Sequence, residues 1–206
     1  RDMSHCPEES ERARLLRLCA DHIVAHGVAG LSLRGIAQAV GSNNRMLLYY
    51  FGSKEELIAA ALTEASRRFP LLEPVFELLE DRSQPLRARL EAAWETLSAD
   101  ENLPFHRVFF EVLGLAGYQR GRFDAFLGAV AKDWRERAAA ALRADGVPAD
   151  AADDLARELI SLWRGLQLDL LTAGDRAATL RVNAAAAASF ADRARQARTA
   201  APLGGR

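Results

Sequence analysis

Apolar side chains recur along this chain at intervals of three and four residues, and sustained alternation of apolar and polar positions is missing. In the first such segment, Leu15, Leu16, Cys19, Ala20 and Ile23 repeat with the period of a helix that buries one face. Alanine, leucine, arginine and glutamate, which all favour helices, dominate the chain, and β-branched residues are sparse. The pattern therefore predicts an all-α protein.

The N-terminal pattern divides into short helices with recognisable start and stop residues. We expect helices over about residues 9–26, 33–40, 44–50 and 53–69. Ser32 and Ser53 are suited to cap the second and fourth of these, and Glu56 completes a capping box with Ser53. Gly41 ends the second helix and opens a tight turn into the third. Two short helices joined in this way form a helix-turn-helix pattern, although an ordinary helical hairpin has the same spacing.

Longer helical patterns fill the rest of the chain. They lie near residues 84–99, 103–118, 122–144, 149–172 and 175–198, after a looser stretch that contains Pro74 and Pro85. A length of 206 residues suits one or two compact domains. We expect an N-terminal domain over residues 1–52 and a C-terminal helical domain over residues 53–206.

Charge is balanced overall but uneven locally. The formal net charge is -1, which argues against a general polyanion binder. Residues 22–54 contain no Asp or Glu, whereas Arg34, Arg45 and Lys54 lie within this window. A locally basic segment in a neutral chain is what contact with a phosphate backbone would need.

Several classes of protein are disfavoured. No apolar run approaches the ~18 residues that cross a bilayer, and no signal-like stretch precedes the first helix. Two cysteines, Cys6 and Cys19, do not make a disulfide framework, so we expect a cytoplasmic protein without a membrane partner. The sequence contains no motif typical of catalysis, of phosphate-binding loops or of metal sites, and we expect neither an enzyme nor a bound cofactor or metal.

Residues 32–57, which read SLRGIAQAVGSNNRMLLYYFGSKEEL, resemble the DNA-binding signature of the tetracycline-repressor (TetR) family of bacterial regulators. The matching parts are Ser32, the Ile36-Ala37 pair, Gly41, the aromatic cluster 49–51 and the segment 53–55. The resemblance covers about the first 65 residues. It implies a three-helix DNA-binding domain with a helix-turn-helix, followed by a helical domain for ligand binding and dimerisation.

In this interpretation, five side chains are candidates for contact with DNA phosphates. Lys54 and Ser32 stand at helix starts, where free backbone N–H groups also face an anion. Tyr49 and Tyr50 offer hydroxyl groups, with core packing as the alternative for each. Arg34 is either a backbone contact or a solvated surface charge. One position departs from the family, because Leu48 stands where a phosphate-contacting tyrosine is common.

Base recognition is expected from the start of the third helix. Asn43 and Asn44 suit adenine, Arg45 suits guanine, and Met46 suits a thymine methyl group. The alternative for Arg45 is a phosphate contact. A single short helix reads few bases, so specific binding implies a homodimer on a pseudo-palindromic double-stranded operator.

The C-terminal helices provide a dimer surface and a ligand chamber in this interpretation. Leu155, Leu159, Leu162, Leu166 and Leu170 form a stripe, and Ile160, Trp163 and Leu171 give the same helix a second apolar face. We expect one face to pack in the subunit and the other against a partner, with a monomer core as the alternative.

The candidate ligand-binding residues are mostly aromatic, with a few polar groups among them, as suits a hydrophobic small molecule. Plain core packing is the alternative for each aromatic. They are Trp94, Phe105, His106, Phe109, Phe110, Trp134, Trp163 and Gln167.

The resemblance implies a ligand-responsive transcriptional regulator, most often a repressor that its effector releases from DNA. In that family the ligand shifts the population of conformations and changes the separation of the two DNA-reading helices. The alternative function is a helical adaptor that binds protein and not DNA. The dependence of binding on salt separates the two, because only DNA binding weakens steeply with salt.

Overall fold

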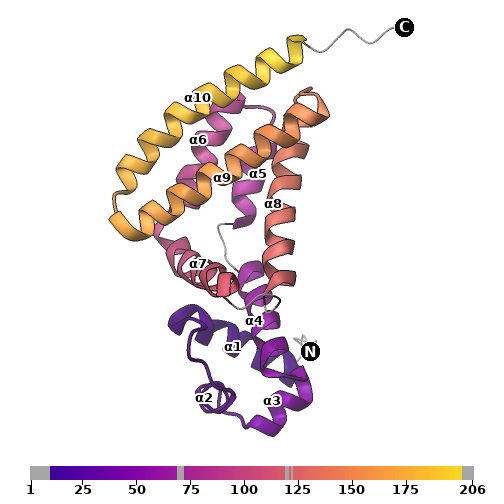
Figure 1. Ribbon diagram of the computed structural model, residues 1–206, viewed down its shortest axis with the longest axis vertical. Coiled ribbons are helices and arrows are strands. Elements are labelled where there is room, and N and C mark those ends of the chain that lie inside the picture. The colour runs from indigo at the N-terminus through magenta and orange to yellow at the C-terminus, as the bar shows by residue number, and fades with distance from the viewer. Residues whose placement is uncertain (1–9, 69–71, 119–120, 122, 201–206) are drawn as a thin grey trace, which may run out of the picture. The chain divides into compact units, whose positions relative to one another are not determined.

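The computed structural model describes residues 10–68, 72–118, 121 and 123–200, and within these residues every regular element is helical (Figure 1). This confirms the predicted all-α class. The chain divides into two compact units. The N-terminal unit comprises Arg1–Arg68 and Arg107–Phe126, and the C-terminal unit comprises Phe69–His106 and Leu127–Arg206. The domain boundary expected after residue 52 stays a prediction.

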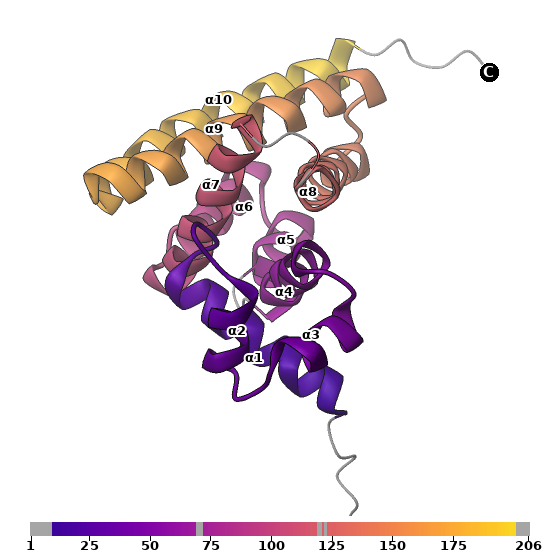
Figure 2. The same ribbon diagram turned by 60° about the horizontal axis from the view of Figure 1, so that its bottom comes forward.

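Four helices form the first part of the N-terminal unit (Figure 2). They are α1 (Glu11–His26), α2 (Leu33–Ala39), α3 (Asn44–Phe51) and α4 (Lys54–Arg68). Helix α1 packs against α4, and their facing sides carry buried Leu15, Ile23, Leu57 and Ile58. The predicted apolar periodicity of α1 therefore faces the core.

The first helix also shows how local chemistry sets its start. It begins at Glu11, because the Ser10 hydroxyl accepts a hydrogen bond from the Ala13 N–H at 3.3 Å. Burial raises the pKa of the Cys19 thiol to about 11, so this cysteine is an inert core residue. Cys6 lies outside the described residues.

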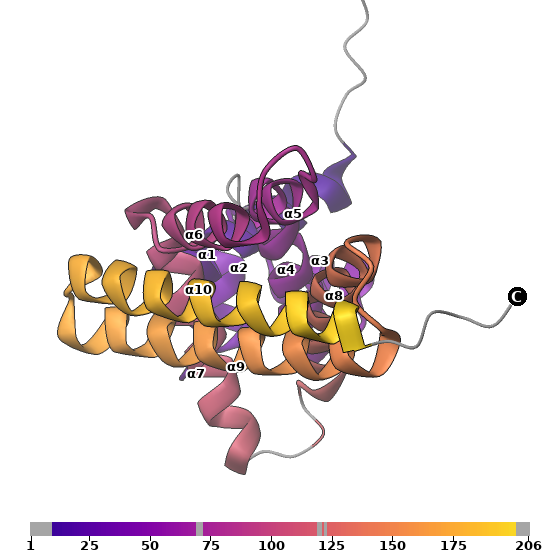
Figure 3. The same ribbon diagram turned by 90° about the horizontal axis from the view of Figure 1, so that it is seen from above.

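The rest of the chain is a set of longer helices. They are α5 (Leu72–Glu80), α6 (Leu86–Leu97), a 3-10 turn (Asp100–Asn102), α7 (Leu103–Tyr118), α8 (Asp124–Ala144), α9 (Ala149–Ala173) and α10 (Arg176–Ala200). In the C-terminal unit, α6 packs against α5 and α10. Helices α9 and α10 form an antiparallel hairpin and run side by side (Figure 3). None of the helices in the described part of the chain is long and apolar enough to span a membrane.

Most of the predicted helices are confirmed, and one region was predicted wrongly. The stretch around Pro74, which we expected to be loose, contains helix α5. Pro74 is the third residue of α5, within the first turn, where backbone N–H groups have no intrahelical acceptor. The proline therefore breaks no hydrogen bond within this helix, and Val75, Phe76 and Leu79 bury its apolar face.

Buried tryptophans mark the core of the C-terminal unit. The rings of Trp94 and Trp163 lie 6.2 Å apart between centroids, and both side chains are fully buried. The Trp163 Nε1–H donates to the Asn183 side-chain oxygen at 2.8 Å, which joins α9 to α10. Burial of each large aromatic side chain contributes on the order of 3 kcal/mol to folding.

Candidate nucleic-acid interface

Helix α3 has a buried face and an exposed face. Leu47 and Phe51 are buried, and they fix the helix to the core of the N-terminal unit. Asn44 and Arg45 are exposed on the first turn, and Met46 is half-buried. The helix therefore presents its polar first turn to solvent while its apolar side holds it in place.

Side-chain caps set the start of α2 and of α3. The Ser32 hydroxyl accepts a hydrogen bond from the Gly35 N–H at 3.0 Å, which confirms the predicted cap of α2. The Asn43 side-chain oxygen accepts one from the Met46 N–H at 3.0 Å. Sequence reasoning assigned Asn43 only to base recognition and missed this capping role. The signal was present, because asparagine immediately before a helix is a preferred cap.

The turn between α2 and α3 depends on a glycine. Gly41 has a φ of 65°, in the left-handed region that other residues adopt at a cost. The Ser42 N–H donates to the Ala37 carbonyl oxygen at 2.8 Å and closes the turn. A fixed turn of this length sets the direction of α3 relative to α2.

The end of α3 carries a group of exposed aromatic and aliphatic side chains. Tyr49 is 77% exposed and Tyr50 is half-buried, and their rings meet edge to face at 5.1 Å between centroids. Leu48 is 42% exposed. Core packing is thus wrong for Tyr49, whose hydroxyl group is free to meet a partner at the surface.

The start of α4 lies directly after this aromatic group. The Ser53 hydroxyl accepts a hydrogen bond from the Glu56 N–H at 3.1 Å and donates one to the Glu56 carboxylate at 2.8 Å. Ser53 is therefore the cap that we predicted. The Glu56 carboxylate, however, accepts its hydrogen bond from the Ser53 hydroxyl group and not from the Ser53 backbone N–H, as it would in a capping box. Lys54 is the first residue of α4 and is half-buried, and Arg34 on α2 is exposed.

A carboxylate that sequence reasoning did not single out holds the loop before α2. Glu111, on α7, accepts hydrogen bonds from the Val28 N–H at 2.9 Å and from the Ala29 N–H at 2.6 Å. Gly27, with a φ of 79°, makes room for it, because a Cβ atom there would collide with the Glu111 carboxylate. The only sequence signal is a lone acidic residue in the apolar α7 segment.

Four of the candidate ligand-binding residues form two buried pairs in the C-terminal unit. His106 bonds the Leu97 carbonyl oxygen through Nε2 at 2.9 Å, and the Gln167 amide lies 3.3 Å from its Nδ1. The network fits a neutral imidazole that donates through Nε2 and accepts at Nδ1. Burial lowers the pKa of His106. Trp94 and Trp163 are the other two residues, as described above.

The remaining ligand-binding candidates are divided between the two units. Phe105 and Phe109 are buried, and Phe110 is half-buried with its ring 5.5 Å from that of Phe109. Trp134 is half-buried on α8 and packs edge to face against Phe76, with 4.8 Å between ring centroids. The assignment of all eight residues to a ligand chamber stays a prediction.

The leucine stripe of α9 is covered within the chain. Leu155, Leu159, Leu166 and Leu170 are buried, and Leu162 is half-buried. Leu168 on α9 and Val182 on α10 are 48% and 50% exposed. The large apolar side chains of this hairpin that stay exposed are therefore Leu168 and Val182, and most of the stripe is buried.

The N-terminal helices match a known family of regulators. Residues 17–61 match the model of the bacterial regulatory proteins of the tetR family. The HTH-type transcriptional repressor NicS of Pseudomonas putida is 31% identical to the chain over 108 residues, which are 47% of this chain and 51% of NicS. The chain thus spans about half the length of this curated relative.

Solved structures show the same fold over most of the chain. A TetR transcription regulator from Haloarcula marismortui has a TM-score of 0.67 and 22% identity, and the match covers 88% of this chain and 96% of that one. A tetR-family transcriptional regulator from Streptomyces coelicolor has a TM-score of 0.63 and 21% identity, with 94% and 93% covered. Residues 17–61 thus resemble the DNA-binding segment of the tetR family of bacterial regulatory proteins, and the chain shares the fold of these solved structures.

Proposed function

We propose that the protein is a DNA-binding transcriptional repressor that acts as a homodimer. The observation that carries this proposal is the exposed first turn of α3, with Asn44 and Arg45 on a helix whose opposite side is buried. A helix held in this way fits the major groove of DNA, where Arg and Asn form paired hydrogen bonds with guanine and adenine. Because a repressor of this kind binds chromosomal DNA, we propose a cytoplasmic location.

The neighbouring helix starts supply the phosphate contacts in this proposal. Ser32 and Lys54 stand at the first turns of α2 and α4, where backbone N–H groups and a cation can meet the DNA backbone. Tyr49 is exposed enough to take the contact that Leu48 cannot make. Arg34 and Tyr50 lie beside these groups in the chain and complete the proposed phosphate-contacting set. Because Asn43 uses its side-chain oxygen as a cap, its NH2 group is left to donate to a base or a phosphate.

A dimer is proposed because one short helix reads too few bases for a specific site. The α9–α10 hairpin supports it, since Leu168 and Val182 are large apolar side chains exposed to solvent. Two such hairpins related by a two-fold axis would cover these residues in a four-helix bundle. The operator would then be a pseudo-palindrome.

We also propose a small hydrophobic effector that binds among the aromatic residues of the helical core. The Trp94 Nε1–H supports this proposal, because it is buried and has no acceptor within the described residues. A buried donor without a partner costs about 1–3 kcal/mol, and an effector with an acceptor group would satisfy it. The effector would shift the population toward a conformation that releases DNA.

Selection of bound fragments from random duplex DNA tests the function directly. The proposal predicts enrichment of a pseudo-palindromic sequence, and affinity for that sequence that falls steeply and log-linearly with salt. A protein-binding adaptor would enrich no sequence. Failure to distinguish any duplex from competitor DNA, over a range of ionic strength, would overturn the proposal.

A further inference from the structure

The C-terminal unit contains a pocket that is lined by arginine side chains and by none of the aromatic ligand-binding candidates. Its volume is about 510 Å³, within the usual range for small-molecule sites. The arginines come from the α5–α6 loop, from α6 and from the last turns of α10. We call this the arginine pocket, and its guanidinium groups are those of Arg82, Arg87, Arg89, Arg195 and Arg198.

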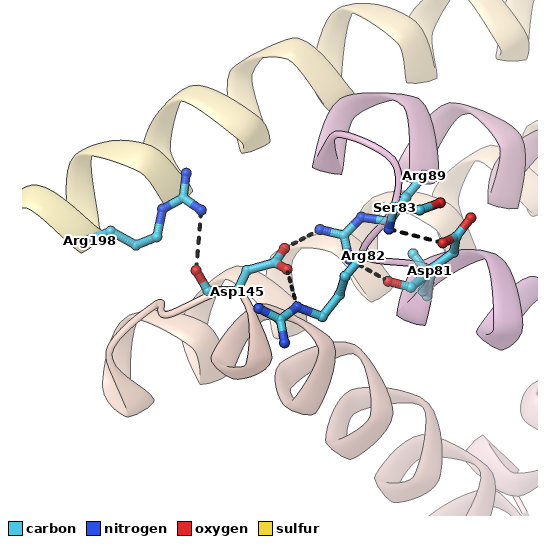
Figure 4. Close-up of polar contacts among 7 residues, drawn as sticks. Asp81, Arg82, Ser83, Arg89, Asp145 and Arg198 are labelled. Carbon is cyan, nitrogen blue, oxygen red and sulfur yellow. Dashed lines mark hydrogen bonds and ion pairs between the residues drawn. The ribbon is translucent and has the colours of Figure 1, made fainter.

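Asp145 is the central carboxylate of the arginine pocket (Figure 4). The Arg89 Nη2 donates to one of its carboxylate oxygens, and the Arg82 Nε lies 3.7 Å from the other. The Arg198 Nη1 donates to the main-chain oxygen of Asp145 at 3.2 Å. The Asp145 carboxylate is therefore the shared counter-ion of the Arg89 and Arg82 guanidinium groups. Arg198 contacts a neutral carbonyl group and not a carboxylate.

The other two arginines of the pocket have carboxylate partners of their own. Arg195 donates to Asp192 at 2.9 Å, and Arg87 donates to Glu91 at 2.7 Å. Asp81, beside the pocket in Figure 4, accepts a hydrogen bond from the Ser83 N–H at 3.0 Å and is not among the lining residues. The negative charge of Asp145 is balanced by Arg89. The positive charges of Arg82 and Arg198 are therefore not fully neutralised within the pocket.

The arginine pocket also contains a buried cation, the guanidinium group of Arg89, which the surrounding fold holds in place. Its side chain is only 3% exposed, and its Nη1 donates to the Leu79 carbonyl oxygen at 2.8 Å. Its Nε is buried and has no acceptor within the described residues. A buried cation with an unsatisfied donor is costly, and Asp145, its counter-ion, is shared with Arg82. An additional anion in the pocket would lower this cost.

We propose that the arginine pocket binds a small multivalent oxyanion, such as a phosphate ester or a polycarboxylate, chiefly through Arg82 and Arg198. Guanidinium groups match the paired oxygens of both chemical groups. Ala188 and Ala191 line the same pocket and leave space beside the arginines because their side chains are small. The site differs from the proposed hydrophobic effector chamber both in its residues and in the chemistry it selects.

Isothermal titration of the full chain without DNA tests this site separately from the proposed function. Pyrophosphate and citrate, at matched low ionic strength, distinguish phosphate from carboxylate ligands. We expect Arg198→Gln and Arg82→Gln each to weaken binding of the preferred anion about tenfold, because each removes charge-assisted hydrogen bonds. Arg82 is 65% exposed, and Arg198 lies on the exposed last turns of α10, so both variants should fold.

Arg143→Gln is the matched control. Arg143 is an exposed arginine of α8 outside the arginine pocket, and its partner is Asp153 at 2.6 Å. The control removes the same charge from the protein and should leave the affinity unchanged. Absence of binding to wild type, or an equal loss in the control, would overturn the proposal.

A second measurement uses the internal carboxylate. Asp145→Asn leaves Arg89 without its counter-ion, so pyrophosphate or citrate should raise the melting temperature of this variant more than that of wild type. An equal rise in both proteins would contradict the proposed site. If the variant does not fold, the titrations of the arginine variants decide.

Discussion

At the scale of single residues, short polar side chains next to helix starts determine where the proposed DNA-contacting groups lie. The Ser32, Asn43 and Ser53 side chains each accept a hydrogen bond from the N–H group three residues later. Such bonds depend only on local sequence, so Ser32 and Ser53 could be predicted as caps. The exposure of Tyr49 could not be predicted, because it depends on which face of α3 the core covers.

Arg45 is the residue with the sharpest expected effect on sequence preference. Arg45→Ala should cost ~1–3 kcal/mol at one base-pair position and relax the preference there, because a guanidinium pairs with guanine O6 and N7. Competition binding with single-base variants of the selected operator measures this. An unchanged preference at every position would exclude base recognition by Arg45 and leave the phosphate contact as its role.

Lys54 should behave differently, because a phosphate contact carries no sequence information. Lys54→Ala should weaken binding to the operator and to random DNA by similar factors. The slope of log affinity against log salt should fall by about one. Loss confined to the operator would contradict the phosphate role.

His106 predicts a pH dependence of folding. Burial lowers its pKa in the folded protein, so the unfolded chain binds the proton more readily. The stability linked to His106 is fully present above the unfolded pKa of about 6.5 and is lost as the pH falls through that value toward the lower folded pKa. Urea titrations between pH 5 and pH 8 should show this loss at an upper limit of about 1.4 kcal/mol per pH unit.

His106→Gln is the control for this titration. The glutamine keeps a side chain that can donate and accept hydrogen bonds but does not titrate in this range. The variant should lose stability less steeply below pH 6.5 than wild type does. Parallel curves for the two proteins would show that His106 is not the source of the pH dependence.

At the scale of elements, helices with one apolar face were predicted well and contacts between distant segments were not. The bounds of α7 agree with the sequence prediction, and those of α9 and α10 agree within two residues. Helix α5 was missed because Pro74 was interpreted as a break, although proline is tolerated in a first turn. The Glu111 contact joins residues more than 80 positions apart, and no local pattern reports such a pairing.

The exposed apolar residues of the α9–α10 hairpin make the proposed dimer testable. Leu168→Glu combined with Val182→Glu should give monomers in light scattering, because two charges would have to be buried at the interface. Both side chains are about half exposed, so the fold should tolerate the change. Leu113→Glu, at a residue that is 42% exposed on α7, is the control and should remain dimeric. A dimer that survives the double substitution would place the interface elsewhere.

At the scale of the whole molecule, the proposal requires two copies of α3 to enter one duplex together. The N-terminal unit supplies the reading helix, and the α9–α10 hairpin of the C-terminal unit supplies the proposed contact between subunits. Sequence patterns indicated both parts, since each depends on helical periodicity. The arginine pocket was not predicted, because it brings together the α5–α6 loop, the end of α8 and the end of α10.

The most direct measurement compares the selected operator with a version in which about five base pairs, half a helical turn, are inserted between its halves. The insertion turns the two half-sites to opposite faces of the duplex while every base contact stays available. Fluorescence anisotropy should show that affinity falls to that of a single half-site. Equal affinity for the two duplexes would contradict simultaneous reading by a pair of α3 helices.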